Sequence, residues 1–396
     1  MSAVLSRVPA LPSPNIIPSG EQSGAISDIV SWYRDRRGRQ EFYVAGFAGV
    51  GKSVTANLAI EELKATCGVR NVRTAAYTGK AASVLRKKGV ECAQTIHSLI
   101  YTAVEDEETG EVHFILSDDS PAADADLIVL DEVSMVNKEI ADDLRSFGKK
   151  ILVLGDPGQL PPVSGEGAFT NREPDVFLRE IHRQAAGSPI IELATLARQG
   201  KPLPKGYEKD GVRVLPLTKE SQPLIYREET QPICGLNRVR WVYNQRIRKL
   251  RGFEGETPQA GEKIICCRNN RDTGLFNGGM GTTLAAASEH EKLRGAWLMD
   301  VRMEDLRGPN LQLAVDPYLF RRNFTNGHAE KLPLRGTRLE EFDFGYTITC
   351  HKAQGSSWDD VTVIDDSSAF RDNRNLWKYT AITRAERGLT VLLRES

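Results

Sequence analysis

The hydrophobic positions in the first half of the chain form short apolar runs that alternate with segments of helical periodicity. The run at 42–46 ends in glycine and precedes a helical pattern at 53–66. The same order recurs at 72–89 and 125–147, and a further apolar run follows at 149–156. Buried strands that alternate with helices are typical of a parallel sheet with helices on both faces. The pattern therefore predicts a doubly wound α/β fold.

Two stretches depart from this alternation. Residues 99–122 alternate apolar and polar positions around a turn at 107–110, which predicts an inserted β-hairpin. Residues 256–340 contain short apolar runs between Gly and Asn turns, a pattern typical of a small β-barrel. Parallel-sheet alternation returns from 341 onward, so we expect the barrel to be inserted in a second α/β unit.

Composition narrows the class of protein without identifying it. The chain has 396 residues, is 40% hydrophobic and 27% charged, and carries a formal net charge of −1. These values exclude wholesale disorder, a collagen-like chain and a miniprotein that needs disulfides or metal. They predict roughly two to four domains. The near-zero charge argues against a surface that is basic throughout, but it leaves room for a basic groove.

The N-terminus and the cysteines indicate an intracellular protein. The first twenty residues are proline-rich and lack the apolar core of a signal peptide, so we expect an extended arm there. No apolar run in the sequence is long enough to span a membrane. The six cysteines lack zinc-site spacing and are expected to be reduced thiols. We therefore expect a cytoplasmic protein.

The most specific motif lies at 46–53, between a predicted strand and a predicted helix. Its sequence, GFAGVGKS, matches the phosphate-binding pattern GxxxxGK[ST]. The glycines let backbone N–H groups wrap the phosphates, and the helix N-terminus adds a positive dipole. Lys52 would reach the β- and γ-phosphates and Ser53 would bind Mg²⁺. The motif predicts a nucleoside triphosphate site whose loop glycines are Gly46, Gly49 and Gly51.

Two acidic residues end the apolar run at 125–132. Asp131 is predicted to bind the Mg²⁺, and Glu132 to act as the general base that accepts a proton from the attacking water. Gln159 follows the next apolar run on a proline-rich turn. Its amide would sense the γ-phosphate, or the segment is only a turn at the end of a strand.

Beyond the P-loop, seven further segments occur in the order and spacing of the superfamily 1 helicase motifs. They are AYTGKAASVL, TIHSL, DEVS, GDPGQLPPV, IHRQ, YTITCHKAQGSSWD and YTAITRAERGL. From Gln22 to Leu389 the sequence resembles the RecD-like and phage Dda-type branch of that superfamily. Two positions depart from commoner forms: Phe47 stands where proline is frequent, and Cys350 where valine is frequent.

The resemblance implies two RecA-like motor domains, each with a parallel sheet. The first, domain 1A, would comprise 1–98 and 123–176, and the second, domain 2A, would comprise 177–255 and 341–396. The hairpin at 99–122 corresponds in position to a strand-separating pin, although its acidic tip could equally be a plain surface loop. The insertion at 256–340 would be an SH3-like β domain, called 2B.

The resemblance also assigns residues to the nucleotide. Gln22 would read the adenine edge, or it is simply an exposed glutamine at the start of a helix. Gln354 and Gly355 would lie on the nucleotide side of the segment that bridges nucleotide and strand. Arg183 and Arg384 correspond to the arginines that the second motor domain directs at the γ-phosphate. A guanidinium suits that role because it stays charged and binds phosphate oxygens bidentately.

Six other residues are implied to contact a single strand of DNA. Hydroxyls and backbone N–H groups are the usual phosphate ligands and carry little sequence information. His97 has an alternative as a core histidine. Aromatic and basic residues of the barrel could stack bases or simply form its core and surface. The six predicted strand contacts are Thr78, Lys80, Thr95, His97, Thr349 and His351.

These features together imply an ATP- and Mg²⁺-dependent DNA helicase that moves 5′ to 3′ on single-stranded DNA and opens forked duplexes. The expected protein is a monomer whose partners include single-strand-binding or replication and recombination proteins. Three alternatives remain at this point: an RNA helicase of the same superfamily, a P-loop switch or loader that moves nothing, and a subunit with a vestigial site. No nuclease signature is visible in the sequence.

Overall fold

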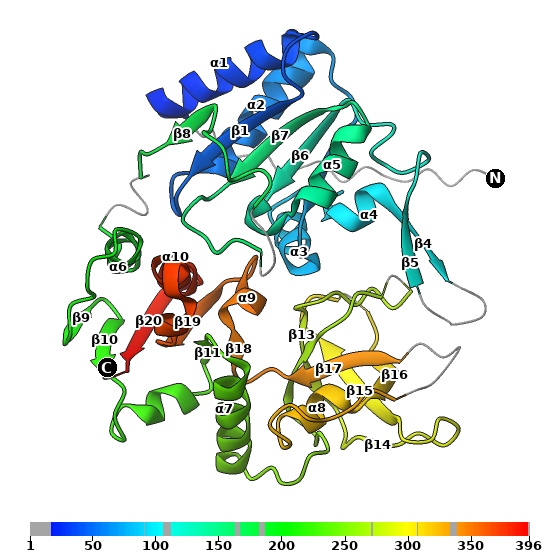
Figure 1. Cartoon of the computed structure of the whole chain (residues 1–396), viewed down its shortest axis with the longest axis vertical. Coiled ribbons are helices and arrows are strands. Elements are labelled where there is room, and N and C mark those ends of the chain that lie inside the picture. The colour runs from blue at the N-terminus through cyan, green and yellow to red at the C-terminus, as the bar shows by residue number, and fades with distance from the viewer. Residues whose placement is uncertain are drawn as a thin grey trace.

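The computed structural model describes residues 17–90, 92–105, 112–162, 167–181, 187–270, 272–306, 308–332 and 339–394. Within these residues the strands form three sheets of six strands each and one two-stranded hairpin. Figure 1 shows the first sheet in the upper part, the second at lower left and the third at lower right. In the described part of the chain, no helix is both long and apolar enough to cross a membrane.

The first sheet has the strand order β3-β2-β6-β7-β1-β8, and all its neighbouring strands are parallel. β6 is buried at every position, as expected for a strand covered on both faces. β8 pairs with β1 and so lies in this sheet, across the expected boundary at 176. The strands are β1 (Glu41–Gly46), β2 (Val72–Ala76), β3 (Gln94–Thr95), β6 (Leu127–Asp131), β7 (Lys150–Gly155) and β8 (Val176–Leu178).

Helices follow these strands in the expected alternation. α2 begins where the P-loop ends, and α3, α4 and α5 begin at residues whose side chains cap the helix N-terminus. Such caps satisfy N–H groups that have no partner within the helix. The helices of this unit are α1 (Gly20–Arg34), α2 (Lys52–Cys67), α3 (Gly79–Lys87), α4 (Ile96–Ile100), η1 (Val133–Met135) and α5 (Lys138–Ser146).

The second sheet has the order β18-β11-β19-β20-β10-β9, with only the edge strand β9 antiparallel to its neighbour. Its strands are β9 (Tyr207–Lys209), β10 (Val212–Pro216), β11 (Thr230–Cys234), β18 (Ile348–Thr349), β19 (Trp358–Ile364) and β20 (Ala385–Leu393). Its helices are α6 (Pro189–Arg198), η2 (Gln222–Tyr226), α7 (Asn237–Leu250), α9 (Cys350–Ala353), η3 (Ser367–Asn373) and α10 (Arg374–Ile382). We call the parts of the chain around these two sheets the first and the second unit. The two parallel sheets agree with the expected pair of RecA-like domains.

The third sheet closes on itself, because β13 pairs with both β12 and β15. Its last strand, β17, ends at Phe344, beyond the expected boundary at 340. Trp297 lies in its hydrophobic core, as one of the two interpretations of the barrel aromatics expected. The elements are β12 (Lys263–Cys266), β13 (Met280–Thr283), β14 (Ser288–Glu289), β15 (Trp297–Met303), β16 (Leu311–Asp316), α8 (Tyr318–Arg322) and β17 (Glu340–Phe344).

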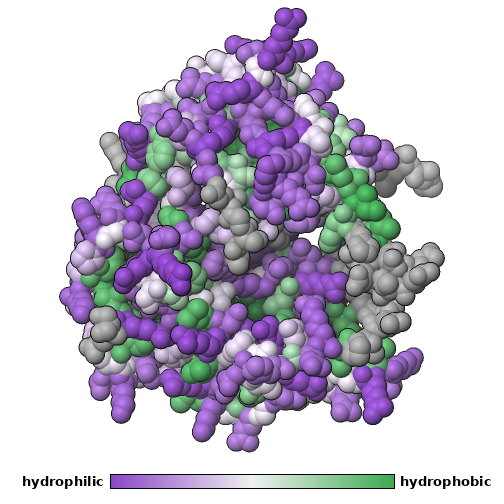
Figure 2. All heavy atoms as spheres, viewed as in Figure 1, coloured by the Kyte–Doolittle hydropathy of each residue, from purple (hydrophilic) through white to green (hydrophobic). Residues whose placement is uncertain are grey.

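The expected hairpin is present as β4 (Tyr101–Glu105) paired antiparallel with β5 (Val112–Leu116). The predicted turn at 107–110 lies outside the described residues. Phe114 and Ile115 on β5 are about half exposed. Figure 2 shows a largely hydrophilic face with hydrophobic side chains gathered over this hairpin.

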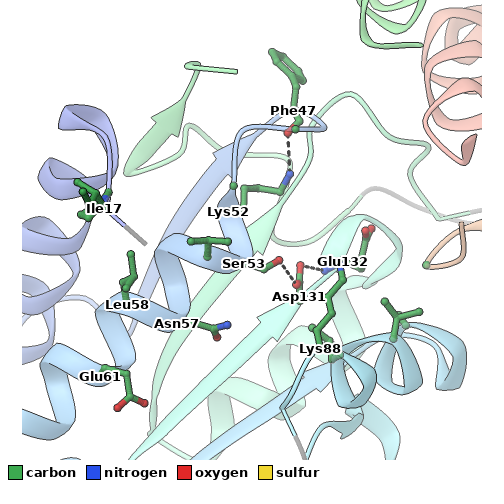
Figure 3. Close-up of a pocket in the computed structure, with 18 residues that line it drawn as sticks. Ile17, Phe47, Lys52, Ser53, Asn57, Leu58, Glu61, Lys88, Asp131 and Glu132 are labelled. Atoms are coloured by element: carbon green, nitrogen blue, oxygen red, sulfur yellow. Dashed lines mark hydrogen bonds between the residues drawn. The ribbon is translucent and has the colours of Figure 1, made fainter. Parts of the chain in front are cut away.

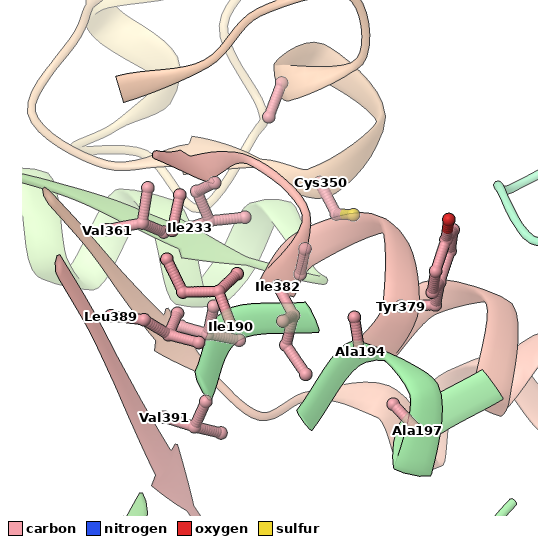
Figure 4. Packing of buried hydrophobic residues seen from close by; sticks show 14 of the residues in the cluster. Ile190, Ala194, Ala197, Ile233, Cys350, Val361, Tyr379, Ile382, Leu389 and Val391 are labelled. Atoms are coloured by element: carbon pink, nitrogen blue, oxygen red, sulfur yellow. The ribbon is translucent and has the colours of Figure 1, made fainter. Parts of the chain in front are cut away.

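A hydrophobic cluster unites the second unit and reaches the first. Side chains from α6, α10 and the strands of the second sheet pack together in it, as Figure 4 shows. Leu160, from the segment after β7, is buried in the same cluster, and Phe47 and Ala48 of the P-loop pack against it. The P-loop therefore lies directly against the second unit.

Candidate nucleotide site and strand-binding residues

The P-loop connects β1 to α2 in the backbone conformation that its glycines permit. Gly49 and Gly51 have φ of 85° and 77°, in the left-handed region that favours glycine. Gly46 is required for a different reason: a Cβ there would lie 2.6 Å from Cγ2 of Val50. Lys52 Nζ donates to the carbonyl oxygens of Gly46 (2.8 Å) and Phe47 (3.2 Å). The ammonium is thereby held over the loop, as Figure 3 shows.

The two acidic residues lie at the end of β6, next to the P-loop. Ser53 Oγ donates to Asp131 Oδ2 at 3.1 Å, and the backbone N–H of Glu132 donates to Asp131 Oδ1 at 2.8 Å. Burial, and next the neighbouring Glu132, raise the pKa of the Asp131 carboxyl. Glu132 has φ of 53°, a strained conformation for a residue with a side chain. The sheet thus places both carboxyl groups beside the start of α2.

These residues suit a magnesium ion bound together with phosphate. A hydroxyl and a carboxylate oxygen are the hard ligands that Mg²⁺ prefers, and Mg²⁺ usually takes only one or two carboxylates plus phosphate oxygens and water. Among the described residues, no group of three or more His, Cys, Asp or Glu side chains could hold a metal by itself. Ser53 and Asp131 therefore fit a nucleotide-bound Mg²⁺ rather than a metal site built by the protein alone.

A cavity of about 1140 Å³ contains this machinery and is lined by both units. Seven of the residues predicted to serve the nucleotide line it: Gly49, Gly51, Lys52, Ser53, Asp131, Glu132 and Gly355. Gly355 comes from the second unit, two residues after the end of α9. Lys88, just after α3, and Asn57 on α2 also line the cavity and were not predicted. Lys88 directly follows the quoted AYTGKAASVL segment and Arg86-Lys87, so a basic run was the available signal.

Among the described residues, five others predicted to serve the nucleotide do not line this cavity. The side chains of four of them form hydrogen bonds with the backbone or with a neighbouring side chain instead. Gln22 is buried, not exposed, and its side chain accepts from the N–H of Ser19 in a capping box. Gln159 Oε1 accepts from Ser134 Oγ at 3.5 Å, and Gln354 Nε2 donates to the oxygen of Leu160 at 2.9 Å. Gly46 lies beneath Lys52.

The two predicted arginines have different outcomes. Arg384 is 6% exposed, and its guanidinium donates to the carbonyl oxygens of Thr380 and Ser356, both at 3.1 Å. It is therefore held within the second unit. Arg183 lies outside the described residues.

The three threonines among the predicted strand contacts share one structural role. Thr78, Thr95 and Thr349 are the N-caps of α3, α4 and α9, and each accepts a backbone N–H of its own helix. Thr78 and Gly355 meet across the two units, since a Cβ on Gly355 would lie 2.9 Å from Thr78 Oγ1. The threonine side chains thus fix the N-termini of three helices that are predicted to contact the DNA strand.

The remaining strand-contact predictions concern one lysine and two histidines. Lys80 Nζ forms an ion pair at 2.5 Å with Asp305, which follows β15 of the barrel and also pairs with Lys87. His97 packs between aromatic rings, and its ring centroid lies 5.5 Å from that of Tyr101 and 5.9 Å from that of Phe114. Burial lowers the pKa of the His97 and His351 imidazoles, so both are neutral at pH 7. The histidines would offer N–H groups and ring faces to a strand rather than charge.

Two family models and several known proteins are similar to this chain. The AAA domain model matches residues 19–213, and the UvrD-like helicase C-terminal domain model matches residues 344–392. The ATP-dependent RecD2 DNA helicase of Deinococcus radiodurans is 28% identical over 93% of this chain and 49% of its own length. This chain thus spans about half of that relative. The ATP-dependent DNA helicase Pif1 of Campylobacter jejuni is 23% identical over 87% of this chain and 86% of the relative.

Solved structures share the fold. The Pif1 helicase from Bacteroides, crystallised with ADP-AlF3 and single-stranded DNA, superposes with a TM-score of 0.58 at 19% identity, covering 96% of this chain and 94% of that one. Pif1 helicase from Candida albicans gives a TM-score of 0.52 at 18% identity, with 95% of each chain covered. The ordered motifs, the two family models and the shared fold agree, and they support the predicted resemblance of this chain to superfamily 1 helicases of the RecD-like and Pif1 type.

Proposed function

We propose that this protein is an ATP-dependent DNA helicase that moves 5′ to 3′ on a single strand and opens duplex DNA. The observation that carries the proposal is the cavity shared by the two units. It collects Lys52, Ser53 and the two carboxylates from the first unit and Gly355 from the second. A ligand bound there touches both units, so its hydrolysis can change how they are placed relative to one another.

Each residue of the cavity has a distinct task in this mechanism. Backbone N–H groups of the P-loop and the Lys52 ammonium would bind and orient the phosphates. Ser53 and Asp131 would hold Mg²⁺, which would neutralise charge on the β- and γ-phosphates. Glu132 would position the attacking water and accept its proton. Its strained backbone fixes that carboxylate at the end of β6.

The second unit would complete the site when the cleft closes. Arg384 and Arg183 would stabilise charge on the transferring phosphoryl group, as an arginine supplied across an interface does in other P-loop enzymes. In the structure Arg384 is bound to backbone carbonyls of its own unit, so this task requires the guanidinium to exchange those partners for phosphate oxygens. Gln159 precedes Leu160 in the chain, and Gln354 donates to the oxygen of Leu160. Through these contacts, loss of the γ-phosphate would change the position of one unit relative to the other.

DNA would lie across the helix starts of both units. Thr78, Lys80, Thr95 and His97 of the first unit, and Thr349 and His351 of the second, would grip one strand mainly through its backbone. Alternate tightening of the two grips would convert each hydrolysis cycle into a step. The hairpin β4–β5 would act as the pin at the fork, and the closed barrel would be the SH3-like domain 2B. We expect the motor to act as a monomer, with single-strand-binding or replication and recombination proteins as partners.

The test is unwinding of a forked duplex with a single 5′ or a single 3′ tail, combined with phosphate release in the presence of DNA or RNA. Opening of only the 5′-tailed DNA, with ATP hydrolysis stimulated by single-stranded DNA, is the expected result. Hydrolysis that no oligonucleotide stimulates would instead identify a P-loop switch or loader. Stimulation by RNA alone would identify an RNA helicase, and preference for a 3′ tail would contradict the proposed direction.

A further inference from the structure

One side chain of the second unit reaches the P-loop itself. Tyr379 lies on α10 and is 2% exposed. Its phenol oxygen accepts the backbone N–H of Ala48, in the P-loop, at 2.8 Å. The same hydroxyl donates to Asp156 Oδ2, just after β7, at 2.7 Å. A single hydroxyl therefore joins two segments of the first unit to a helix of the second.

The direction of these two hydrogen bonds is fixed by chemistry. Ala48 N–H can only donate, so the phenol oxygen accepts from it and its own proton is free to be donated to Asp156 Oδ2. The other carboxylate oxygen, Asp156 Oδ1, accepts the N–H of Gly158 at 2.9 Å. Burial raises the pKa of the Tyr379 phenol, which keeps its proton in place for donation. The hydroxyl is thus a relay with both its hydrogen-bonding functions in use.

The next residue of α10 makes a second link to the same unit. Thr380 Oγ1 accepts the backbone N–H of Leu160 at 2.9 Å, and the oxygen of Leu160 accepts from Gln354 at 2.9 Å. The carbonyl of Thr380 in turn accepts from Nε of Arg384 at 3.1 Å. One turn of α10 therefore contacts the P-loop, the segment after β7 and the arginine predicted to meet the γ-phosphate.

The ring of Tyr379 fits closely as well. It meets the Phe47 ring edge to face at 6.2 Å, and a Cβ on Gly158 would lie 2.9 Å from Tyr379 Cε1. Figure 4 shows the Tyr379 side chain pointing away from the other labelled core residues. A phenylalanine ring could make the same packing contacts. The hydroxyl adds hydrogen bonds to both the P-loop backbone and Asp156.

We propose that Tyr379 is a positioning residue for ATP hydrolysis, which sets the P-loop relative to the turn of α10 that carries Arg384. The inference rests on the proposed ATP-driven function. With the hydroxyl in place, Lys52 and Arg384 are connected by hydrogen bonds to the Phe47–Ala48 peptide and to Tyr379 and Thr380 of α10. Without it, the P-loop still binds nucleotide, but the second unit is less precisely placed for the chemical step.

The decisive variant is Tyr379→Phe, because it keeps the ring and removes only the hydroxyl. Its matched control is Tyr207→Phe. Tyr207, on β9 of the same unit, also donates to a carboxylate, Glu192 at 3.0 Å, but it is on the edge strand of the second sheet. Steady-state hydrolysis with and without single-stranded DNA, together with thermal unfolding, is measured for wild type and both variants.

For Tyr379→Phe we expect kcat to fall about tenfold, since loss of a buried hydrogen bond that leaves its partners unsatisfied costs on this order. The KM for ATP should change less than about threefold, and Tyr207→Phe should match wild type in both constants. A kcat within twofold of that of Tyr207→Phe would overturn the proposal, even if Tyr379→Phe unfolds at a lower temperature. That outcome would leave Tyr379 a packing residue only.

Two further results separate the inference from the proposed function. If DNA does not stimulate wild-type hydrolysis, the helicase proposal fails, while basal kcat of the two variants still decides the role of Tyr379. If Tyr379→Phe does not fold, Asp156→Asn tests the same link by replacing the carboxyl group that accepts from the phenol. It should lower kcat more than it raises KM, and an unchanged kcat would overturn the proposal.

Discussion

Lys52 and Arg384 are both predicted to meet the γ-phosphate, but the structure treats the two cations differently. Lys52 lines the nucleotide cavity and is bound to two carbonyls of its own loop. Arg384 is buried in the second unit, with its guanidinium on the backbone of Thr380 and Ser356. The first unit therefore brings its predicted phosphate ligands together in one cavity, whereas the second unit holds Arg384 apart from the lining of that cavity.

This difference indicates which unit controls nucleotide binding and which controls the chemical step. Lys52, Ser53 and Asp131 are brought together by one strand, one loop and one helix start, so they can bind phosphate without the second unit. Arg384 depends on where α10 lies relative to the P-loop. Binding should therefore depend mainly on the first unit, and the chemical step on both.

The largest effect is expected from Arg384→Ala. An arginine that stabilises the transition state of phosphoryl transfer contributes about 10³-fold or more to kcat. We expect a loss of that order, with the KM for ATP changed less than about threefold, in steady-state hydrolysis with saturating single-stranded DNA. An equal loss in nucleotide affinity would contradict the comparison, because it would place Arg384 in the ground-state site.

Lys52→Ala should be the next largest. Removing a cation aimed at the phosphates typically costs about 10²- to 10³-fold in kcat. Unlike Arg384→Ala, it should also weaken binding of an ATP analogue, since Lys52 lines the cavity. Equilibrium binding of a fluorescent analogue measures this, and unchanged circular dichroism confirms that the variant folds. Unchanged affinity would erase the predicted difference between the two cations.

The nucleotide site was predictable from sequence where its residues are close in the chain or at strand ends. The P-loop is eight consecutive residues, and Asp131 follows from the rule that parallel strands end at one edge of a sheet. The two parallel sheets were predicted from the alternation of apolar runs with helical segments. Periodicity reports which face of an element is buried, and this fixes the class of fold.

Contacts between distant segments were not predictable in the same way. Ala48 and Tyr379 are 331 residues apart, and Lys80 and Asp305 are 225 apart. Tyr379 lay in a segment already recognised, YTAITRAERGL, but nothing local distinguishes a phenol that bridges two units from one in a core. Likewise, the sequence around Lys80 predicted a phosphate ligand. It gave no sign of the carboxylate that pairs with Lys80, because Asp305 comes from the barrel.

Gly355→Ala tests whether the two units must approach closely at the shared cavity. Gly355 has φ of 74°, and a Cβ there would lie 2.8 Å from the Cβ of Ala81. We expect about a tenfold loss of DNA-stimulated kcat, because the added methyl separates the units. Gly206→Ala is the matched control, since Gly206 has φ of 77° with nothing within 4 Å of the added carbon. Similar losses in both would attribute the effect to backbone strain alone.

The smallest effect is expected at the ion pair between the first unit and the barrel. Burial by itself disfavours the charged form of Asp305, but hydrogen bonds from Lys80 and Lys87 outweigh it and lower the pKa of the carboxyl. Asp305 therefore remains charged at pH 7 and, under the proposed function, would compete with DNA phosphates for Lys80. Asp305→Asn should tighten binding of single-stranded DNA about threefold, measured by fluorescence anisotropy at fixed salt.

Asp300→Asn is the control, because in the described residues the Asp300 carboxylate accepts from Gln312 and forms no ion pair with a lysine. The sign of the pH dependence follows from the lowered pKa. The ion pair contributes stability at pH values above about 3.9, the ordinary value for aspartate, and that contribution is lost as pH falls through the lower folded value. Asp305→Asn should remove this acid-sensitive part of thermal stability. Weaker DNA binding by Asp305→Asn than by Asp300→Asn would mean that the pair orients Lys80 toward the strand instead of competing for it.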